Sequence, residues 1–388
     1  MPAYGDFTYF GLLLYIVIPT IVLGLLGRIG KLWILLTTAL VLAVQLSGKL
    51  RLPQTSFELR EVWFFAAFGV WQTALAFAFL KLRKPKYLIW PAVALAILPL
   101  ILAKAIPLQI PGGAMTHLGL SYITFRALDV VLSIHDGVIK QLSLRTWLVF
   151  LFFFPVISSG PIDRYRRFEK DFDKKRTRAE FLDDLDAAIY HVFRGFLYKF
   201  ILAALINLKW IVPLSGISGP WATMGYMYAY TFFLFFDFAG YSAFAVGFSR
   251  LFGIKTPENF DLPFIARNIR DFWNRWHISL SFWFRDHIYM RFLIAATKGK
   301  WFRGKHTANY VGLFITFGLM GIWHGTAKHY LLYGLYHAAL LCGFDWFARW
   351  NKERKLWPES RIGRIGSILL TFHVVAFGLL LFSGRLTD

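Results

Sequence analysis

The sequence has little of the side-chain chemistry on which many soluble enzymes depend. It contains a single cysteine, Cys342, so no disulfide can form within the chain. This cysteine lies in an apolar segment, where a small packing residue is more common than a nucleophilic thiol. The histidines lack the spacing and the companion ligands of a zinc site, and no phosphate-binding glycine loop or G-x-S-x-G elbow is present. We therefore expect no metal site and no cofactor bound by the chain itself.

Acidic residues are also scarce, with 22 Asp and Glu against 43 Lys and Arg, which gives a net charge of +21. The cations gather in four clusters, at residues 81–86, 164–178, 267–305 and 349–364. Each cluster flanks apolar segments, which argues against a separate basic domain that binds nucleic acid. The positive-inside rule places all four clusters on the cytoplasmic side. A basic cytoplasmic face attracts anionic lipids of the bilayer and acidic protein partners.

Polar residues are in the minority as well, since 57% of the 388 residues are hydrophobic and many of these form continuous apolar runs. Continuous apolar runs of this kind are typical of transmembrane helices. They occupy residues 9–26, 32–46, 62–80, 87–103, 147–157, 192–212, 224–248, 311–323, 330–347 and 365–382. We expect an all-α, polytopic integral membrane protein with about ten or eleven transmembrane helices, forming a single domain over residues 1–388. No cleavable signal sequence is expected, so the first span is retained.

The segment at residues 117–135 does not fit a simple crossing of the membrane. It carries Arg126 and Asp129, and a complete crossing would place the cations of residues 164–178 outside the cell. Polar, broken segments at membrane depth are tolerated where protein buries them or where they line a cavity. We therefore predict a re-entrant or partly sunken element here.

The segment at residues 178–197 has the pattern of an amphipathic helix. Apolar side chains from Phe181 to Phe193 recur at helical spacing. The pattern places the acidic residues on the opposite face, namely Asp183, Asp184 and Asp186. This predicts a surface helix that leads into the next span.

The segment at residues 264–305 is too polar to cross a membrane and too aromatic for a solvated loop. The i,i+4 spacing of Asp271 and Arg275 favours a helical stretch. One interpretation is an interfacial helix anchored by three tryptophans, Trp273, Trp276 and Trp283. The other is a polar segment inside the bundle that lines a reaction chamber. We favour a mixture, in which outer arginines anchor the segment and residues 274–281 line the chamber.

Two histidines in unlike surroundings are the candidate catalytic residues. His324 ends an apolar run, where an ionisable group is costly and often functional, and His277 lies in the polar segment. Burial favours the neutral imidazole, which is the form that a general base requires. His324 could equally be a packing residue. The neighbouring Gly321 and Gly325 either allow close helix contact or leave space beside the imidazole for a substrate.

Five strings stand in order along the chain: GLSYITFR at 119–126, SGPIDRYRRF at 159–168, FFDFAGYS at 235–242, the run 257–286 and MGIWHG at 320–325. Together they strongly resemble the membrane-bound O-acyltransferase (MBOAT) superfamily, in particular its bacterial branch that transfers D-alanine to teichoic acid. The resemblance implies a ring of tilted helices around a cytoplasmic tunnel, with the core motifs at residues 119–337. It also implies a multi-pass protein of the bacterial plasma membrane. Carried over by position, His324 is the family's catalytic histidine and His277 its second signature histidine.

The implied reaction is the transfer of D-alanine from a thioester to teichoic acid hydroxyls, including those of lipoteichoic acid. The donor is the phosphopantetheine arm of a small acidic D-alanyl carrier protein in the cytoplasm, and other D-alanylation proteins act at the membrane. Residues expected along the tunnel are Asn274, Arg275, Ser281 and Trp323. Direct transfer and an acyl-enzyme on Ser279 or Ser281 are both open. The alternatives are an O-acetyltransferase for an exported polysaccharide, or a transporter or flippase that uses His324 as a gate.

The carrier protein needs a docking surface, and residues 290–298 combine apolar side chains with neighbouring cations. We predict Leu293 and Ile294 as the apolar contact. The cations expected to steer an acidic helical partner are Arg291, Lys298 and Lys300. The alternative is a plain helix on the membrane surface.

Overall fold

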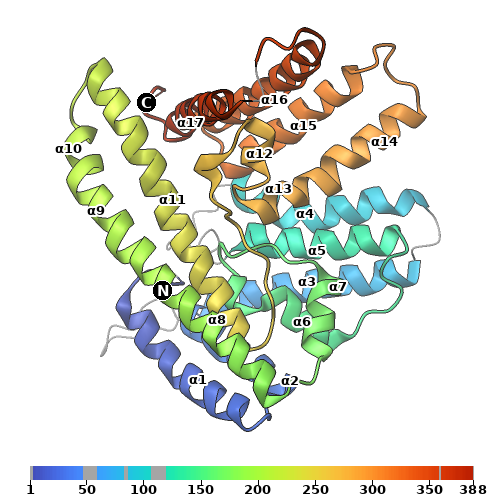
Figure 1. The fold of residues 1–388 in the computed structure, drawn as a ribbon. Coiled ribbons are helices and arrows are strands. Elements are labelled where there is room, and N and C mark those ends of the chain that lie inside the picture. The colour runs from blue at the N-terminus through green and yellow to red at the C-terminus, as the bar shows by residue number, and fades with distance from the viewer. Residues whose placement is uncertain (1–2, 47–58, 83–85, 106–118, 358–359, 388) are drawn as a thin grey trace. The chain divides into compact units, whose positions relative to one another are not determined.

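The computed structural model describes residues 3–46, 59–82, 86–105, 119–357 and 360–387, and within these ranges the chain is helical without a named strand (Figure 1). Contacts divide the chain into two compact units. The first unit comprises Met1–Arg194 and Tyr241–Pro257, and the second comprises Gly195–Gly240 and Glu258–Asp388. The all-α prediction is confirmed for the described ranges, whereas the single-domain interpretation stays a prediction.

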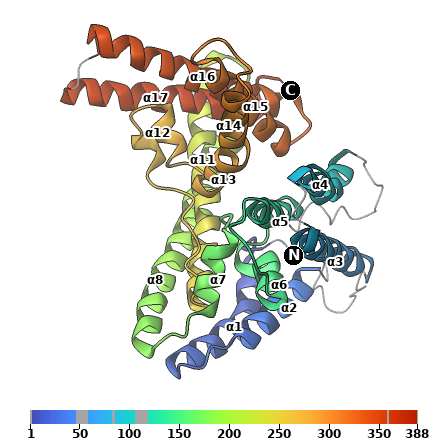
Figure 2. The same cartoon turned by 90° about the vertical axis from the view of Figure 1, so that its right-hand side faces the viewer.

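The described residues of the first unit form a series of α-helices that begins with α1 and is labelled in Figures 1 and 2. They are α1 (Phe7–Leu25), α2 (Lys31–Leu46), α3 (Leu59–Leu82), α4 (Ile89–Ala105), α5 (Leu120–His135), α6 (Leu144–Phe152), α7 (Tyr165–Asp173) and α8 (Arg178–Phe196). A long helix, α11 (Pro220–Leu251), contributes its second half to this unit.

The second unit begins where α8 continues without a break into a helical run that ends at Ser215. This run consists of the π-helical segment η4 (Leu197–Ala203), α9 (Ala204–Ile206), the π-helical segment η5 (Asn207–Ile211) and α10 (Val212–Ser215). The remaining elements include α12 (Ile269–Trp273), α13 (Ile278–Phe284), the π-helical turn η7 (Arg285–Tyr289), α14 (Met290–Lys298), α15 (Thr307–His324), α16 (Lys328–Arg354) and α17 (Arg361–Phe382). In Figure 2, α16 and α17 lie side by side.

Each of the ten predicted apolar segments overlaps a helix, and the run that starts at Trp147 is interrupted after α6. Within the described ranges, five helices are long and apolar enough to cross a membrane. They are Phe7–Leu25, Trp63–Leu82, Arg178–Ser215, Pro220–Leu251 and Arg361–Phe382. Shorter apolar helices occur at Lys31–Leu46, Ile89–Ala103 and Leu144–Val156. The polytopic membrane fold is therefore confirmed, although fewer helices meet this length than the ten or eleven predicted spans.

Helix α5 buries the two charged residues that distinguished its segment. The Arg126 guanidinium donates to the carbonyl oxygens of Phe150 and Leu151, at 3.2 and 3.1 Å, and to that of Val156. Asp129 accepts from the Arg164 side chain at 2.7 Å. Carbonyls at the end of a helix have no partner within it, so Arg126 satisfies groups that burial would otherwise penalise. The charges are buried in protein, as a non-crossing element requires; residues 117 and 118 lie outside the described ranges, and re-entry itself stays a prediction.

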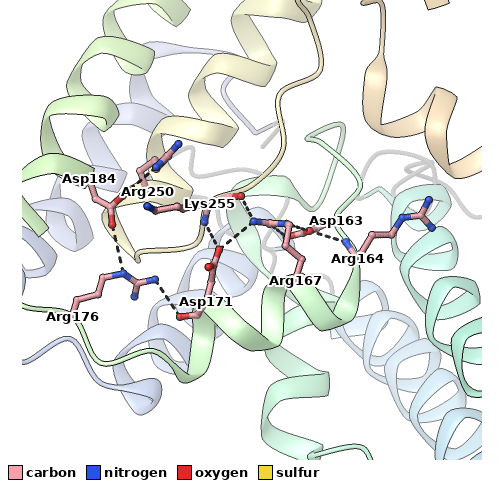
Figure 3. Close-up of polar contacts among 8 residues, drawn as sticks. All are labelled: Asp163, Arg164, Arg167, Asp171, Arg176, Asp184, Arg250 and Lys255. Carbon is pink, nitrogen blue, oxygen red and sulfur yellow. Dashed lines mark hydrogen bonds and ion pairs between the residues drawn. The ribbon is translucent and has the colours of Figure 1, made fainter. Parts of the chain in front are cut away.

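The amphipathic interpretation of α8 is wrong at one residue. Asp184 was expected on the solvent face, but its side chain is buried and forms ion pairs with two arginines (Figure 3). Arg250 donates to Asp184 at 3.2 Å, and the Arg176 Nε lies 3.5 Å from its other oxygen. Phe181, three residues before Asp184, is also buried. The buried face of α8 therefore includes a carboxylate. Helical spacing within α8 cannot reveal this, because both cations that pair with Asp184 lie outside α8, at Arg176 and Arg250.

Other members of this charge network come from the string at 159–168. Arg167 pairs with both Asp163 and Asp171, and Asp171 also accepts from the backbone N–H of Lys255 at 2.8 Å (Figure 3). Gly253 lies in the left-handed region at φ +71°, and a Cβ there would fall 1.9 Å from the Arg176 guanidinium carbon. The string therefore has a structural role in the first unit, where it holds the loop that follows α11.

Replacing Asp184 with alanine should lower the free energy of unfolding by about 3 kcal/mol, because it leaves two largely buried guanidinium groups without their carboxylate. Asp183→Ala is the matched control on the exposed face of the same turn, with an expected effect within about 0.5 kcal/mol. Thermal unfolding of the detergent-solubilised variants measures both effects. Equal losses for the two variants would contradict the buried network.

In the second unit, α15 and α16 pack with their backbones in close approach at two glycines. A Cβ on Gly321 would lie 2.5 Å from the Tyr330 carbonyl oxygen, and one on Gly334 would lie 2.2 Å from the Phe317 carbonyl oxygen. Real Cβ atoms are not found so close to a backbone oxygen, so only glycine fits at either position. Of the two roles considered for Gly321, close helix contact is therefore confirmed. The contact also fixes α15, which carries His324 at its end.

Candidate active site

The polar segment of the second unit folds back on the chain that precedes it. Phe260 and Trp276 form an isolated antiparallel bridge, and the Asp261 N–H donates to the Arg275 carbonyl at 2.9 Å. The Ile278 N–H donates to the Asn259 carbonyl at 3.0 Å. These bonds on both sides of residue 277 fix the turn between α12 and α13.

The predicted i,i+4 pair of Asp271 and Arg275 is confirmed, with Arg275 Nε 2.8 Å from the carboxylate. Arg275 also pairs with the Asp261 carboxylate at 3.3 Å. Burial raises the pKa of Asp271, but hydrogen bonds from the Arg267 N–H and from Arg275 outweigh burial and lower that pKa overall. Arg275, predicted as a tunnel residue, therefore holds the turn through ion pairs.

The three tryptophans predicted as interfacial anchors, Trp273, Trp276 and Trp283, are buried, so that interpretation is wrong. Trp273 packs edge-on against Phe317, with ring centroids 5.0 Å apart. Trp276 packs against Phe260 at 5.1 Å. The segment is aromatic because its rings form the core of this unit around the turn.

His277 occupies the turn itself, outside the membrane-length helices, in the left-handed region at φ +44°. Its imidazole is 5% exposed and meets the ring of Phe238 edge-on at 4.6 Å. Among the described residues, no hydrogen-bond partner exists for Nε2. Burial, and then the charge of His324, lower the pKa of His277, so its imidazole is neutral near pH 7. The charge of one imidazole therefore acts on the other.

His324 is the last residue of α15 and is half-buried among aromatic rings. The ring centroids of Trp323 and Phe382 lie 4.6 and 4.9 Å from that of the imidazole. Tyr330 and Tyr333 of α16 each lie at 6.2 Å. Packing therefore buries His324 only in part, and the residue stays partly accessible.

The other predicted tunnel residues differ in what they offer a substrate. Asn274 is exposed at the end of α12, and the Trp323 ring packs at a tilt of 60° against that of His324. Ser281 donates its hydroxyl to the Trp276 carbonyl at 3.1 Å, and Ser279 donates to the Asn259 side-chain oxygen at 2.6 Å. Both serine protons therefore point to protein acceptors, which disfavours either hydroxyl as an activated nucleophile.

Sequence reasoning missed the aromatic side chains that surround the two histidines. These are Phe238, Tyr330, Tyr333 and Phe382. Their only signal was position in long apolar segments, where aromatic residues are normally attributed to lipid contact. Within the described ranges, no group of three or more His, Cys, Asp or Glu side chains could hold a metal ion.

The predicted docking segment forms α14, a short helix followed by a turn. Ile294 is 49% exposed, whereas Leu293 and Arg291 are half-buried, so the prediction of Leu293 as an exposed contact is only partly met. Lys298 and Lys300 are exposed. Trp301, which the sequence did not single out, is 58% exposed.

Comparison with known proteins agrees with this arrangement. The model of the membrane-bound O-acyltransferase family matches residues 114–377. The teichoic acid D-alanyltransferase of Bacillus subtilis (strain 168) is 43% identical, over 99% of this chain and 98% of its own length. That of Streptococcus thermophilus is 40% identical over 82% and 81%. A probable alginate O-acetylase of Pseudomonas syringae is 32% identical over 58% of this chain and 43% of its own length.

The family match covers both histidine-bearing segments, α12–α13 and the end of α15, and it accompanies a helical membrane fold. The chain is therefore a multi-pass membrane protein and an acyltransferase, and it belongs to the membrane-bound O-acyltransferase family.

Proposed function

We propose that the protein transfers D-alanine from the phosphopantetheine thioester of an acidic cytoplasmic carrier protein to hydroxyls of teichoic acid, with His324 as the general base. The observation that carries the proposal is the placement of two histidines in the second unit. One is half-buried among aromatic rings, and the other is buried, with no hydrogen-bond partner for its Nε2 among the described residues. Relatives named teichoic acid D-alanyltransferase, which match 76% to 99% of the chain, support the choice of acyl group and acceptor.

In the proposed reaction, the His324 imidazole takes the proton of the acceptor hydroxyl as its oxygen attacks the thioester carbonyl carbon. The tetrahedral intermediate collapses with cleavage of the C–S bond. The imidazolium returns the proton to the departing thiolate, so the products are the D-alanyl ester and the free thiol of the arm. In the part of the chain that the structure describes, His277 Nε2 has no hydrogen-bond partner, and we propose that it bonds a substrate group as the companion residue.

An O-acetyltransferase for an exported polysaccharide is the second candidate, supported by the weaker similarity to alginate O-acetylases. A transporter or flippase would move the intermediate without bond chemistry. Purified protein in liposomes, supplied with acceptor and with carrier protein that bears radiolabelled D-alanine or radiolabelled acetate, separates the three. We expect label on the acceptor from the D-alanyl carrier alone. Transfer from the acetyl carrier alone, or movement of label without a new ester, would overturn the proposal.

Charge reversal at Lys298 and Lys300 should raise the KM for the acidic carrier about tenfold, which corresponds to ~1.4 kcal/mol, with little change in kcat. Both lysines are exposed beside Ile294. The matched control reverses Lys352 and Lys355, which are also exposed, and Lys355 shares the left-handed backbone of Lys300. A steady-state titration of the carrier measures the effect. An unchanged KM would favour a plain membrane-surface role for α14.

A further inference from the structure

A third histidine, His337, is buried in the same unit as the two candidate catalytic histidines. It belongs to α16, and none of its surface is exposed. Its Nδ1 accepts a hydrogen bond from the Trp273 indole N–H at 3.3 Å. An indole N–H can only donate, so Nδ1 is unprotonated and the ring proton is on Nε2.

The position of His337 connects it to both histidines of the site. Trp273 is the last residue of α12, four residues before His277. On the other side, the Tyr333 ring lies 4.6 Å from that of His337 and 6.2 Å from that of His324. His337 therefore contacts both Trp273, which leads into the His277 turn, and Tyr333, whose ring lies near the His324 imidazole.

The His337 ring also lies close to α17, at Gly378. A Cβ on Gly378 would lie 2.5 Å from His337 Nε2, so this helix approaches closely only because residue 378 has no side chain. Among the described residues, Nε2 has no hydrogen-bond partner. A buried donor without an acceptor is destabilising, and a hydrophobic side chain of similar size would avoid that cost. The histidine is therefore not explained by packing alone, and its hydrogen bond to Trp273 is the feature that a hydrophobic residue could not supply.

We propose that His337 is a positioning residue, which orients Trp273 through Nδ1 and so fixes the His277 turn relative to the His324 imidazole. The inference rests on the proposed function, because it concerns the geometry of that same site. A displacement of about 1 Å at a reacting group costs up to about 100-fold in rate. The expected defect of a variant is therefore in kcat and not in the affinity for the carrier.

Two amide variants, which differ in the length of the side chain, test the hydrogen bond itself. The Asn side chain places its carbonyl oxygen near the position of Nδ1, whereas that of Gln reaches toward the position of Nε2. We expect His337→Gln to lower kcat for acyl transfer at least tenfold, with KM for the carrier within about twofold. His337→Asn should restore kcat to within about threefold of wild type. Both are assayed in liposomes with the D-alanyl carrier, after equal melting temperatures have been verified.

A double-mutant cycle gives a second readout, which isolates the coupling between the two side chains when each substitution removes only their interaction. Trp273→Phe removes the indole N–H and keeps an aromatic ring, so it should lower kcat as much as His337→Gln, and the two together should lower it no further. Additive losses, or a full kcat for His337→Gln, would overturn the positioning role. The proposed function fails separately, if the wild-type protein itself transfers no D-alanine.

Discussion

Replacing His324 with alanine should lower kcat for D-alanyl transfer by about 10³-fold, because general-base catalysis by a positioned side chain contributes about 10²- to 10⁴-fold. The KM for the carrier should change little, because the imidazole acts on the acceptor proton and lies outside the predicted docking segment. Half-burial of the ring implies a small effect on folding. Initial rates in liposomes with radiolabelled D-alanyl carrier measure the loss.

His373→Ala is the matched control, because this exposed histidine bonds the carbonyl of Leu369 within its own helix. It should transfer label within about twofold of wild type. If His324→Ala transferred label at the wild-type rate, the general base would have to be another group, with His277 the next candidate.

Gly334→Val should disrupt the native packing of α15 on α16. The free energy of unfolding should fall by about 3 kcal/mol, which is the upper end of the usual cost of overpacking. The reason is that its Cβ position lies 2.2 Å from the Phe317 carbonyl oxygen, and backbone atoms of a packed helix cannot move aside as a side-chain tip can. The fraction of monodisperse protein after extraction and its melting temperature measure the effect.

Gly343→Val provides the control in the same helix, where nothing lies within 4 Å of the new Cβ. Because both variants exchange glycine for valine within α16, their intrinsic helix propensities change equally. A melting temperature for Gly334→Val equal to that of Gly343→Val would show that the helices do not approach as closely as described.

The sequence predicted the helical membrane fold because apolar periodicity is a local property. The same locality explains where prediction failed. Asp184 is buried through Arg176 and Arg250, and neither partner is visible in the pattern of α8. Trp273 and Trp276 looked like interfacial anchors because composition cannot distinguish a ring at the membrane surface from a ring in a core.

For the candidate site, the sequence singled out both histidines through their unusual surroundings and through the family strings. It did not reveal their neighbours. Tyr333 and Phe382 approach His324 only when α16 and α17 are placed beside α15. The ion pair of Arg275 with Asp261 depends on the bridge between Phe260 and Trp276. These contacts join residues distant in sequence, so periodicity carries no signal for them.

The backbone of His277 is strained at a position that belongs to the candidate site. A non-glycine side chain at φ +44° costs roughly 1 kcal/mol or more, which glycine would avoid. The same substitution would also remove the buried imidazole that packs edge-on against Phe238 and would leave a cavity in its place. His277→Gly in a search for thermostable variants would therefore exchange backbone strain for lost packing, and it would remove a residue of the candidate site as well.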